Sequence, residues 1–362
     1  MRKLLLSAAL FTLAALPLAT AQTIELLGAG ATFPAPLITA MADDYRDATG
    51  GQVVVNYQAI GSGGGIRQFT EQTVMFGMTE AFLNDEQLAA IAAAGGGTAF
   101  NLPITLGDVV ATYNVPGVPR GLVLDGETLA DIFLGDVTRW DDPAIARLNP
   151  DARLPGLPIT VVHRSDGSGT TNIWTSFLSK ASPKWAEEVG FGTAVDWATG
   201  IGGNGNEGVA GVVMNTPGAI GYNSLVYAAL NDIPYAYLVN RSGNVIEPSL
   251  QATSLAAEVE LPADTRILVT DTEAAEGYPA AGFAWMLLYE NLEANRAIRD
   301  REQAEALLQF VLWTITEGQD ISEFLSFSRI PEAVLQLNLD MLRRVKWRSE
   351  DLGAQVLEAA GY

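Results

Sequence analysis

A short stretch in the middle of the chain places a turn rich in glycine and hydroxyl groups between a strand and a helix. Residues 164–171 read Arg-Ser-Asp-Gly-Ser-Gly-Thr-Thr, the run 159–162 before them is typical of a strand, and the run 172–178 after them is typical of a helix. This order brings several free backbone N–H groups to one point, and the helix dipole adds partial positive charge there. The sequence therefore predicts an anion site at this turn.

The same pattern occurs twice more, nearer the N-terminus. Residues 28–33 (Gly-Ala-Gly-Ala-Thr-Phe) and 61–65 (Gly-Ser-Gly-Gly-Gly) each precede a helical run. All three turns place hydroxyl side chains at the entry of a helix, namely Thr32, Ser62, Ser168 and Thr170. Each hydroxyl can donate to an anion or cap its own helix, and both interpretations stay open. Three such turns in one chain predict that one small tetrahedral anion is held by all of them.

Arg164 precedes the third turn. Its planar guanidinium can hold an oxyanion through two parallel hydrogen bonds, and Asp166 can keep the guanidinium in place. The alternative is a surface ion pair, which contributes little to stability. Beside three anion-type turns, we expect the ligand role.

Residue usage argues against catalysis and against a bound metal or cofactor. The chain has no Cys and a single His, His163, so a structural zinc site and a nucleophile–base pair are not expected. No glycine is followed by Lys-Ser or Lys-Thr, which excludes a Walker A loop. Residues 200–205 fit G-x-G-x-x-G but lack a strong strand before them, and we expect a loop there.

The N-terminus predicts export. Arg2 and Lys3 precede the apolar segment 4–18, and Ala-Thr-Ala at 19–21 fits a cleavage site. Residues 1–21 are therefore expected to be a signal peptide cleaved after Ala21, with a membrane anchor as the alternative. We expect a periplasmic protein that is not inserted in the membrane.

The acidic balance limits the partners. Asp and Glu outnumber Lys and Arg by 42 to 21, a net charge of −21 that becomes −23 without the two basic residues of the signal peptide. This charge argues against binding nucleic acid or anionic membranes. It does not exclude an anion pocket, because surface charges are screened beyond roughly 8–10 Å at physiological salt.

Strand-like and helix-like runs alternate from residue 22 onward, for example 23–27, 34–49, 53–57 and 283–289. Such alternation with apolar strands predicts an α/β fold with mainly parallel sheets. The length suits two domains or two lobes. Kinks are expected at 116–119 and 278–282, where proline and glycine follow or precede strong strands.

At these motifs the chain resembles the periplasmic phosphate-binding proteins of high-affinity phosphate ABC transporters. The resemblance covers nearly the whole mature chain, and is carried by residues 28–36, 57–65, 122–126, 140–150, 166–170 and 217–222. It implies a type II periplasmic-binding-protein fold in which two crossover strands form a hinge. Lobe one would be residues 22–113 plus 284–362, and lobe two residues 114–283.

The resemblance also implies the ligand contacts. Phosphate would be bound by Thr32, Phe33, Ser62, Glu80, Arg164, Ser168, Gly169 and Thr170, with Asp166 orienting Arg164. The family has an aspartate where this chain has Glu80. A buried carboxylate accepts a hydrogen bond from the P–OH of phosphate but faces sulfate without a proton between the charges, so Glu80 is expected to select phosphate.

The implied function is a monomeric carrier that delivers inorganic phosphate to the transmembrane permease subunits of an ABC importer. Three alternatives stay open. They are the same fold with another oxyanion (sulfate, arsenate or a phosphonate), an exported phosphatase, and a surface protein that binds a partner instead of a solute.

Overall fold

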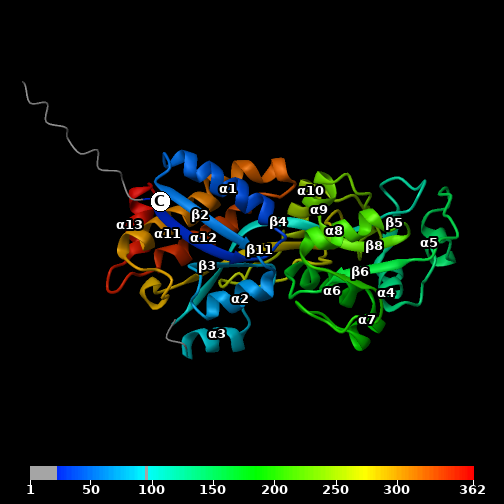
Figure 1. Ribbon diagram of the computed structural model, residues 1–362, viewed down its shortest axis with the longest axis horizontal. Coiled ribbons are helices and arrows are strands. Elements are labelled where there is room, and N and C mark those ends of the chain that lie inside the picture. Colours follow the sequence, from blue (N-terminus) through cyan, green and yellow to red (C-terminus); the bar gives the residue numbers. More distant parts are fainter. Residues whose placement is uncertain (1–22, 94–96) are drawn as a thin grey trace, which may run out of the picture.

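One mixed sheet runs through the molecule in the strand order β2-β1-β3-β11-β4-β8-β6-β7. We describe it from a computed structural model that covers residues 23–93 and 97–362 (Figure 1). The predicted signal peptide lies outside the described residues. The strands of the sheet are β1 (Ile24–Gly30), β2 (Val53–Ala59), β3 (Phe76–Thr79), β4 (Ala99–Tyr113), β6 (Thr160–Arg164), β7 (Ile201–Gly203), β8 (Ala219–Ser224) and β11 (Ala281–Tyr289).

The molecule has two halves, and β4 belongs to both. Residues 99–108 of β4 pair with β11, and residues 109–113 pair with β8. We call the part built on β1, β2, β3 and β11 the first half, and the part built on β6, β7 and β8 the second half. All fifteen residues of β4 are buried. At the change of partner lies Asp108, which is 1% exposed and accepts a hydrogen bond from Thr253 Oγ1 at 2.9 Å.

Within each half the outer strands are parallel, as the β-α alternation predicts. β1 pairs with β2 and β3 in parallel, and β6 pairs with β7 and β8 in parallel. The central pairs of this sheet, β3–β11, β11–β4 and β4–β8, are antiparallel. The expected α/β fold is therefore confirmed, with an antiparallel centre where the chain passes between the halves. A small second sheet has the order β10-β9-β5 (β5 Val123–Asp125, β9 Tyr237–Val239, β10 Val245–Ile246).

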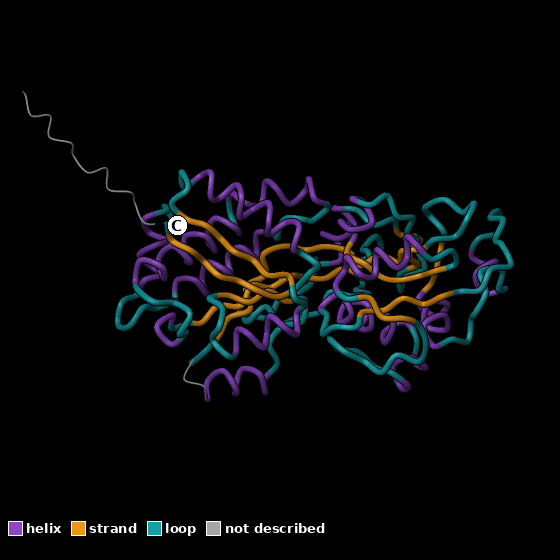
Figure 2. Tube along the Cα trace, in the orientation of Figure 1, coloured by secondary structure: helices purple, strands orange, loops and turns teal. Residues whose placement is uncertain are grey.

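Helices surround the strands of both halves (Figure 2). Those on or beside the first half are α1 (Ala35–Ala48), α2 (Ser62–Thr70), α3 (Asp85–Ile91), α11 (Arg301–Ile315), α12 (Glu332–Arg343) and α13 (Leu352–Ala359), with the 3-10 helices η2 (Leu292–Ala294) and η3 (Glu317–Leu325). The others are α4 (Gly126–Leu134), α5 (Pro143–Leu148), α6 (Gly169–Ala181), α7 (Pro183–Glu188), α8 (Gly205–Asn215), α9 (Leu225–Leu230) and α10 (Leu250–Ala256).

Helix α1 illustrates how the sequence determines an element. Proline at its start fixes φ and needs no N–H partner, which favours a first helical turn. Its apolar residues recur at helical spacing, and Leu37, Met41 and Tyr45 are buried. The ring of Tyr45 packs 5.2 Å from that of Phe310 on α11. Gly50 then adopts φ +60°, a conformation that ends a helix at little cost.

One prediction about the fold is wrong. Residues 201–203, expected in a loop, form the short strand β7 parallel to β6, with Val162 paired to Ile201. Two of the three residues are glycine and Ile201 is 46% exposed, so neither an apolar run nor strand propensity indicated it. The segment is extended because its backbone pairs with β6, and its residue types alone do not favour a strand.

Candidate functional site

The second and third glycine turns touch each other across the two halves. The N–H of Gly63 donates to the carbonyl oxygen of Gly167 over 3.0 Å. Gly61 has φ +84°, and a Cβ on it would lie 2.7 Å from that same carbonyl oxygen. Both the backbone conformation and the lack of space therefore require glycine at this position. The approach brings the start of α2 to the start of α6.

The first turn joins them through a residue that the sequence did not indicate. The Nδ2 of Asn206 on α8 donates to Thr32 Oγ1 over 2.8 Å and to Thr170 Oγ1 over 3.0 Å. All three side chains are buried, with 3% exposure or less. The three turns, spread over residues 28–171, thus converge at one place between the halves. The one signal near Asn206 in the sequence is the 200–205 motif directly before it.

Arg164 lies at the end of β6, and its side chain is 1% exposed. Its Nε donates to Asp166 Oδ1 over 2.8 Å, its Nη2 pairs with the other carboxylate oxygen, and its Nη1 donates to Thr170 Oγ1 over 3.3 Å. Both carboxylate oxygens of Asp166 therefore contact the guanidinium. Burial works to raise the pKa of Asp166, but hydrogen bonds and the charge of Arg164 hold it below its ordinary value.

Glu80 follows β3 and is 1% exposed. Ser62 Oγ donates to its Oε2 over 3.3 Å, and Asn172 Nδ2 on α6 donates to its backbone oxygen over 3.2 Å. Its Oε1 has no hydrogen-bond partner among the described residues. Burial raises the pKa of Glu80 to about 8, although the charge of Arg164 and the bond from Ser62 oppose the shift and Asp166 adds to it.

Four backbone N–H groups at these turns are candidate donors to a ligand. Within the described residues, no protein acceptor takes the N–H groups of Phe33, Ser62, Gly169 and Thr170. A Cβ on Gly169 would lie 2.6 Å from Ser62 Oγ and 2.6 Å from the Glu80 nitrogen, so these groups lie close together. Such donors at helix starts are suited to an oxyanion.

The hydroxyl groups divide between the two interpretations that the sequence left open. Ser168 caps α6, since its Oγ accepts the N–H of Thr171 over 3.0 Å. Thr32 does not cap α1, whose N-cap residue is Pro34, and its oxygen faces Asn206 instead. Ser62 belongs to the first turn of α2 and turns its oxygen to Glu80. A capping oxygen such as that of Ser168 still has its own proton to donate.

A groove of about 370 Å³ opens beside this convergence, and both halves line it. The first half contributes Ile66, Ala81 and Phe82, and the second half contributes Asn172 and Phe191. Ala81 follows Glu80 in the chain, but none of the predicted site residues lines the groove. The contacts from Gly63 to Gly167 and from Asn206 to Thr32 bring the predicted site residues together at the seam between the halves.

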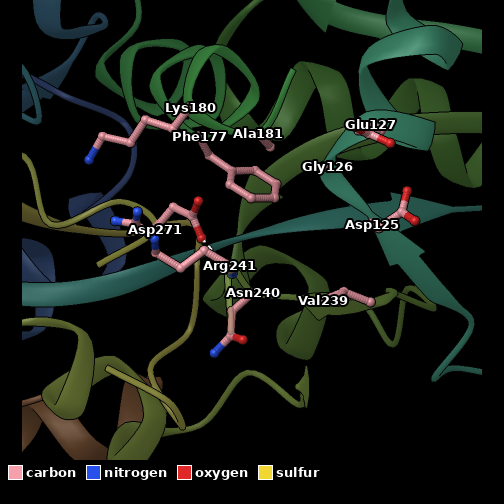
Figure 3. Close-up of a pocket in the computed structure, with 10 residues that line it drawn as sticks. All are labelled: Asp125, Gly126, Glu127, Phe177, Lys180, Ala181, Val239, Asn240, Arg241 and Asp271. Atoms are coloured by element: carbon pink, nitrogen blue, oxygen red, sulfur yellow. Dashed lines mark hydrogen bonds between the residues drawn. The ribbon is translucent and has the colours of Figure 1, made fainter. Parts of the chain in front are cut away.

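A second cavity, of about 380 Å³, lies in the part of the chain after β4 (Figure 3). Asp271 and Arg241 lie together on one side of it, and Asp125 and Glu127 on the other. None of the predicted site residues lines it. The Nζ of Lys180 donates to the Thr270 carbonyl, and Arg241 pairs with Glu273 at 2.7 Å, so both cations already have protein partners. Its chemistry is mixed in charge and does not resemble the anion site.

The single histidine and the carboxylates of the described part of the chain are not grouped as a metal site. His163 stacks on Trp197 with ring centroids 4.9 Å apart, a packing role. In residues 23–93 and 97–362, no three His, Asp or Glu side chains are grouped as metal ligands. Nor does any helix in those ranges have the length and apolar character needed to span a membrane.

Comparison with known proteins identifies the class. A family model described as a PBP superfamily domain matches residues 17–316. Among solved structures, a putative phosphate ABC transporter substrate-binding protein with bound phosphate from Clostridium perfringens aligns with a TM-score of 0.61 at 18% identity, covering 85% of this chain and 100% of that one. The high-affinity periplasmic phosphate-binding protein PfluDING, bound with phosphate, aligns with a TM-score of 0.68 at 19% identity, covering 89% and 98%. At these identities the structures show a shared fold.

A curated relative defines the family more closely. The phosphate-binding protein PstS of Pasteurella multocida (strain Pm70) is 39% identical over 339 residues, which cover 92% of this chain and 94% of that protein. The chain belongs to the PstS family within the PBP superfamily.

Proposed function

We propose that this protein is the substrate-binding component of an ABC importer for inorganic phosphate. It would bind phosphate between its two halves in the periplasm and deliver it, as a monomer, to the transmembrane permease subunits. The observation that carries the proposal is the convergence of three helix-start turns around a buried Arg164 that Asp166 holds in place. The PstS relatives and the phosphate-bound neighbours support the same ligand.

The proposed ligand residues are those that the sequence predicted. Thr32, Phe33 and Ser62 would donate from the first half, and Arg164, Ser168, Gly169 and Thr170 from the second. Micromolar binding requires about −8 kcal/mol. Charge-assisted hydrogen bonds are roughly twice as strong as neutral ones, so these donors can supply that free energy after desolvation.

Glu80 is the proposed proton partner of the ligand. Its buried Oε1 without a protein partner supports this role, because an orphaned oxygen costs free energy unless a ligand satisfies it. One proton would be shared between Glu80 and phosphate. Either the phosphate carries it, and its P–OH donates to the Glu80 carboxylate, or Glu80 carries it, and its carboxyl group donates to a phosphate oxygen. Sulfate carries no proton at neutral pH. It can therefore bind beside Glu80 only when the Glu80 carboxyl group is itself protonated.

The halves are proposed to move as lobes about two crossover segments. The change of partner within β4 between residues 108 and 109 supports one crossover, and the start of β11 at Ala281 supports the other. We therefore propose that the hinge lies within β4, a few residues before the boundary at 113 that the sequence predicted. Cleft closure between lobes is a common route to enclosing a ligand.

A carrier is proposed in preference to an enzyme because the converging groups are donors that bind and orient. The homologues are named as phosphate-binding proteins. Another oxyanion, such as sulfate or arsenate, is the second candidate. One observation favours it: with a pKa near 8, Glu80 is largely protonated at pH 7 and can donate to an anion that has no proton.

The test is a calorimetric titration of residues 22–362, unfolded and refolded to remove ligand. Phosphate is titrated with and without excess sulfate at pH 7. Tight phosphate binding that sulfate does not weaken supports the proposal. Competition by sulfate favours the second candidate, and no phosphate binding at millimolar concentration overturns the proposed function. Turnover of a chromogenic phosphate ester would instead support a phosphatase.

A further inference from the structure

Thr32 is held by the opposite half at both its side chain and its backbone. Its Oγ1 accepts the backbone N–H of Asn206 over 3.2 Å in addition to the side-chain Nδ2. Its carbonyl oxygen accepts the hydroxyl of Tyr227 over 2.6 Å. Thr32 follows β1 in the first half, whereas Asn206 and Tyr227 belong to α8 and α9 in the second. Three donors from one half therefore converge on one residue of the other.

The donors are fixed by contacts within their own half. The Oδ1 of Asn206 accepts the N–H of Ser224 over 2.9 Å, which turns the Nδ2 group toward Thr32. The hydroxyl of Tyr227 also lies 2.9 Å from Glu207 Oε1. A phenol has one proton, so the Thr32 carbonyl and the Glu207 carboxylate compete for it. Tyr227 is 5% exposed, and its ring cannot swing away without opening the packing around it.

The same helix start is connected to the arginine. The N–H of Gly205, the residue before Asn206, donates to Asp166 Oδ1 over 3.0 Å. Asp166 in turn holds Arg164. The start of α8 therefore contacts both Thr32 and the aspartate that holds the Arg164 guanidinium.

We propose that Tyr227, with Asn206, forms a latch on Thr32 that keeps the halves closed and slows release of the anion. This inference rests on the proposed function. Tyr227 acts through the Thr32 carbonyl, so it is a positioning residue. The anion enters the open form, in which the latch is not made, so the latch lowers the dissociation rate and leaves the choice of anion unaffected. It lowers the association rate only by the fraction of anion-free protein that it holds closed.

Tyr227→Phe removes the hydroxyl and keeps the ring. Losing one buried hydrogen bond should speed phosphate release about 3- to 10-fold in stopped-flow measurements, with the association rate unchanged or raised and the phosphate-to-sulfate affinity ratio unchanged. The matched control is Tyr57→Phe. The Tyr57 hydroxyl donates to the Ala31 carbonyl over 2.7 Å, in the same turn, but both residues belong to the first half. This control should release phosphate at the wild-type rate.

A second measurement does not depend on phosphate. The chain has no cysteine, so Asp44→Cys on α1 and Glu187→Cys on α7 give two unique labelling positions, both exposed. Energy transfer between labels there reports the closed fraction of anion-free protein. Tyr227→Phe should lower this fraction, and Tyr57→Phe should not.

The outcomes separate the two proposals. If wild type binds no phosphate, the proposed function fails, and the labelled pair still tests the latch. Unchanged release and an unchanged closed fraction in Tyr227→Phe overturn the latch. So does a lowered association rate or an altered anion preference, which would place Tyr227 in recognition.

Discussion

The carboxyl group of Glu80 lies 3.3 Å from the hydroxyl of Ser62, while its other oxygen has no hydrogen-bond partner among the described residues. Burial dominates this environment and raises the pKa of Glu80 to about 8. The group is thus neutral at pH 7 in the structure as it stands, and it can exchange one proton with a ligand. The ligand preference of the proposed site is therefore predicted to depend on pH.

Sulfate affinity is predicted to fall as pH rises through about 8, whereas phosphate affinity holds. Above its pKa Glu80 is ionised, and sulfate binding then requires uptake of a proton, which lowers affinity up to tenfold per pH unit. Dibasic phosphate supplies its own P–OH to the carboxylate. Calorimetric titrations with each anion from pH 6 to 9 check this. In Glu80→Gln the pH dependence for sulfate should disappear and phosphate should bind more weakly; a retained dependence would assign it to another group.

Arg164→Lys is predicted to weaken phosphate binding by about 10²- to 10³-fold. Lysine keeps the charge but cannot hold Asp166 and an oxyanion with one planar group. The matched control is Arg139→Lys, because Arg139 pairs with Asp141 at the same spacing of two residues but is exposed. Its effect on binding should be undetectable. Equal affinities for wild type and Arg164→Lys would show that the guanidinium does not contact the ligand.

Gly169→Ala is predicted to abolish tight binding without unfolding the protein. The added Cβ would lie 2.6 Å from Ser62 Oγ and the Glu80 nitrogen in the other half, so it would keep the halves apart. We expect at least a 100-fold loss of phosphate affinity and a melting temperature within a few degrees of wild type. Gly211→Ala on α8, where a Cβ meets nothing within 4 Å, is the control. A large fall in melting temperature would instead indicate damage to the fold.

Asp108→Asn is predicted to remove part of the pH dependence of stability. Burial raises the pKa of Asp108 to about 8, against the hydrogen bonds from Thr253 and Ser249, so the folded state keeps its proton where the unfolded state has lost it. This contribution is complete below the unfolded pKa near 4 and declines up to about pH 8, by as much as about 1.4 kcal/mol per pH unit.

Urea unfolding at pH 5 and pH 8 tests this expectation. The free energy of unfolding should fall less from pH 5 to pH 8 in Asp108→Asn than in wild type. Asp44→Asn, on an exposed part of α1, is the control and should follow wild type. Parallel curves for wild type and Asp108→Asn would contradict the shifted pKa of Asp108.

The parts of the site that could be predicted from sequence are local. Arg164 and Asp166 are two residues apart at the end of one strand, so their pairing needs no tertiary information. Each glycine turn likewise shows its strand and its helix beside it. Asn206 could not be assigned in this way, because its partner Thr32 is 174 residues away and nothing in its neighbours indicates that contact. The short strand β7 was missed because its order comes from pairing with β6.

The arginine and its carboxylate have a consequence for the order of events in binding. Arg164, Asp166 and Thr170 all belong to the second half, and their mutual hydrogen bonds cross no boundary. The proposed opening of the halves would therefore leave this arrangement intact. An incoming anion would meet a charged surface that is already shaped for it. First encounter would then require no rearrangement, and the later enclosure by the first half would be the step that moves the protein.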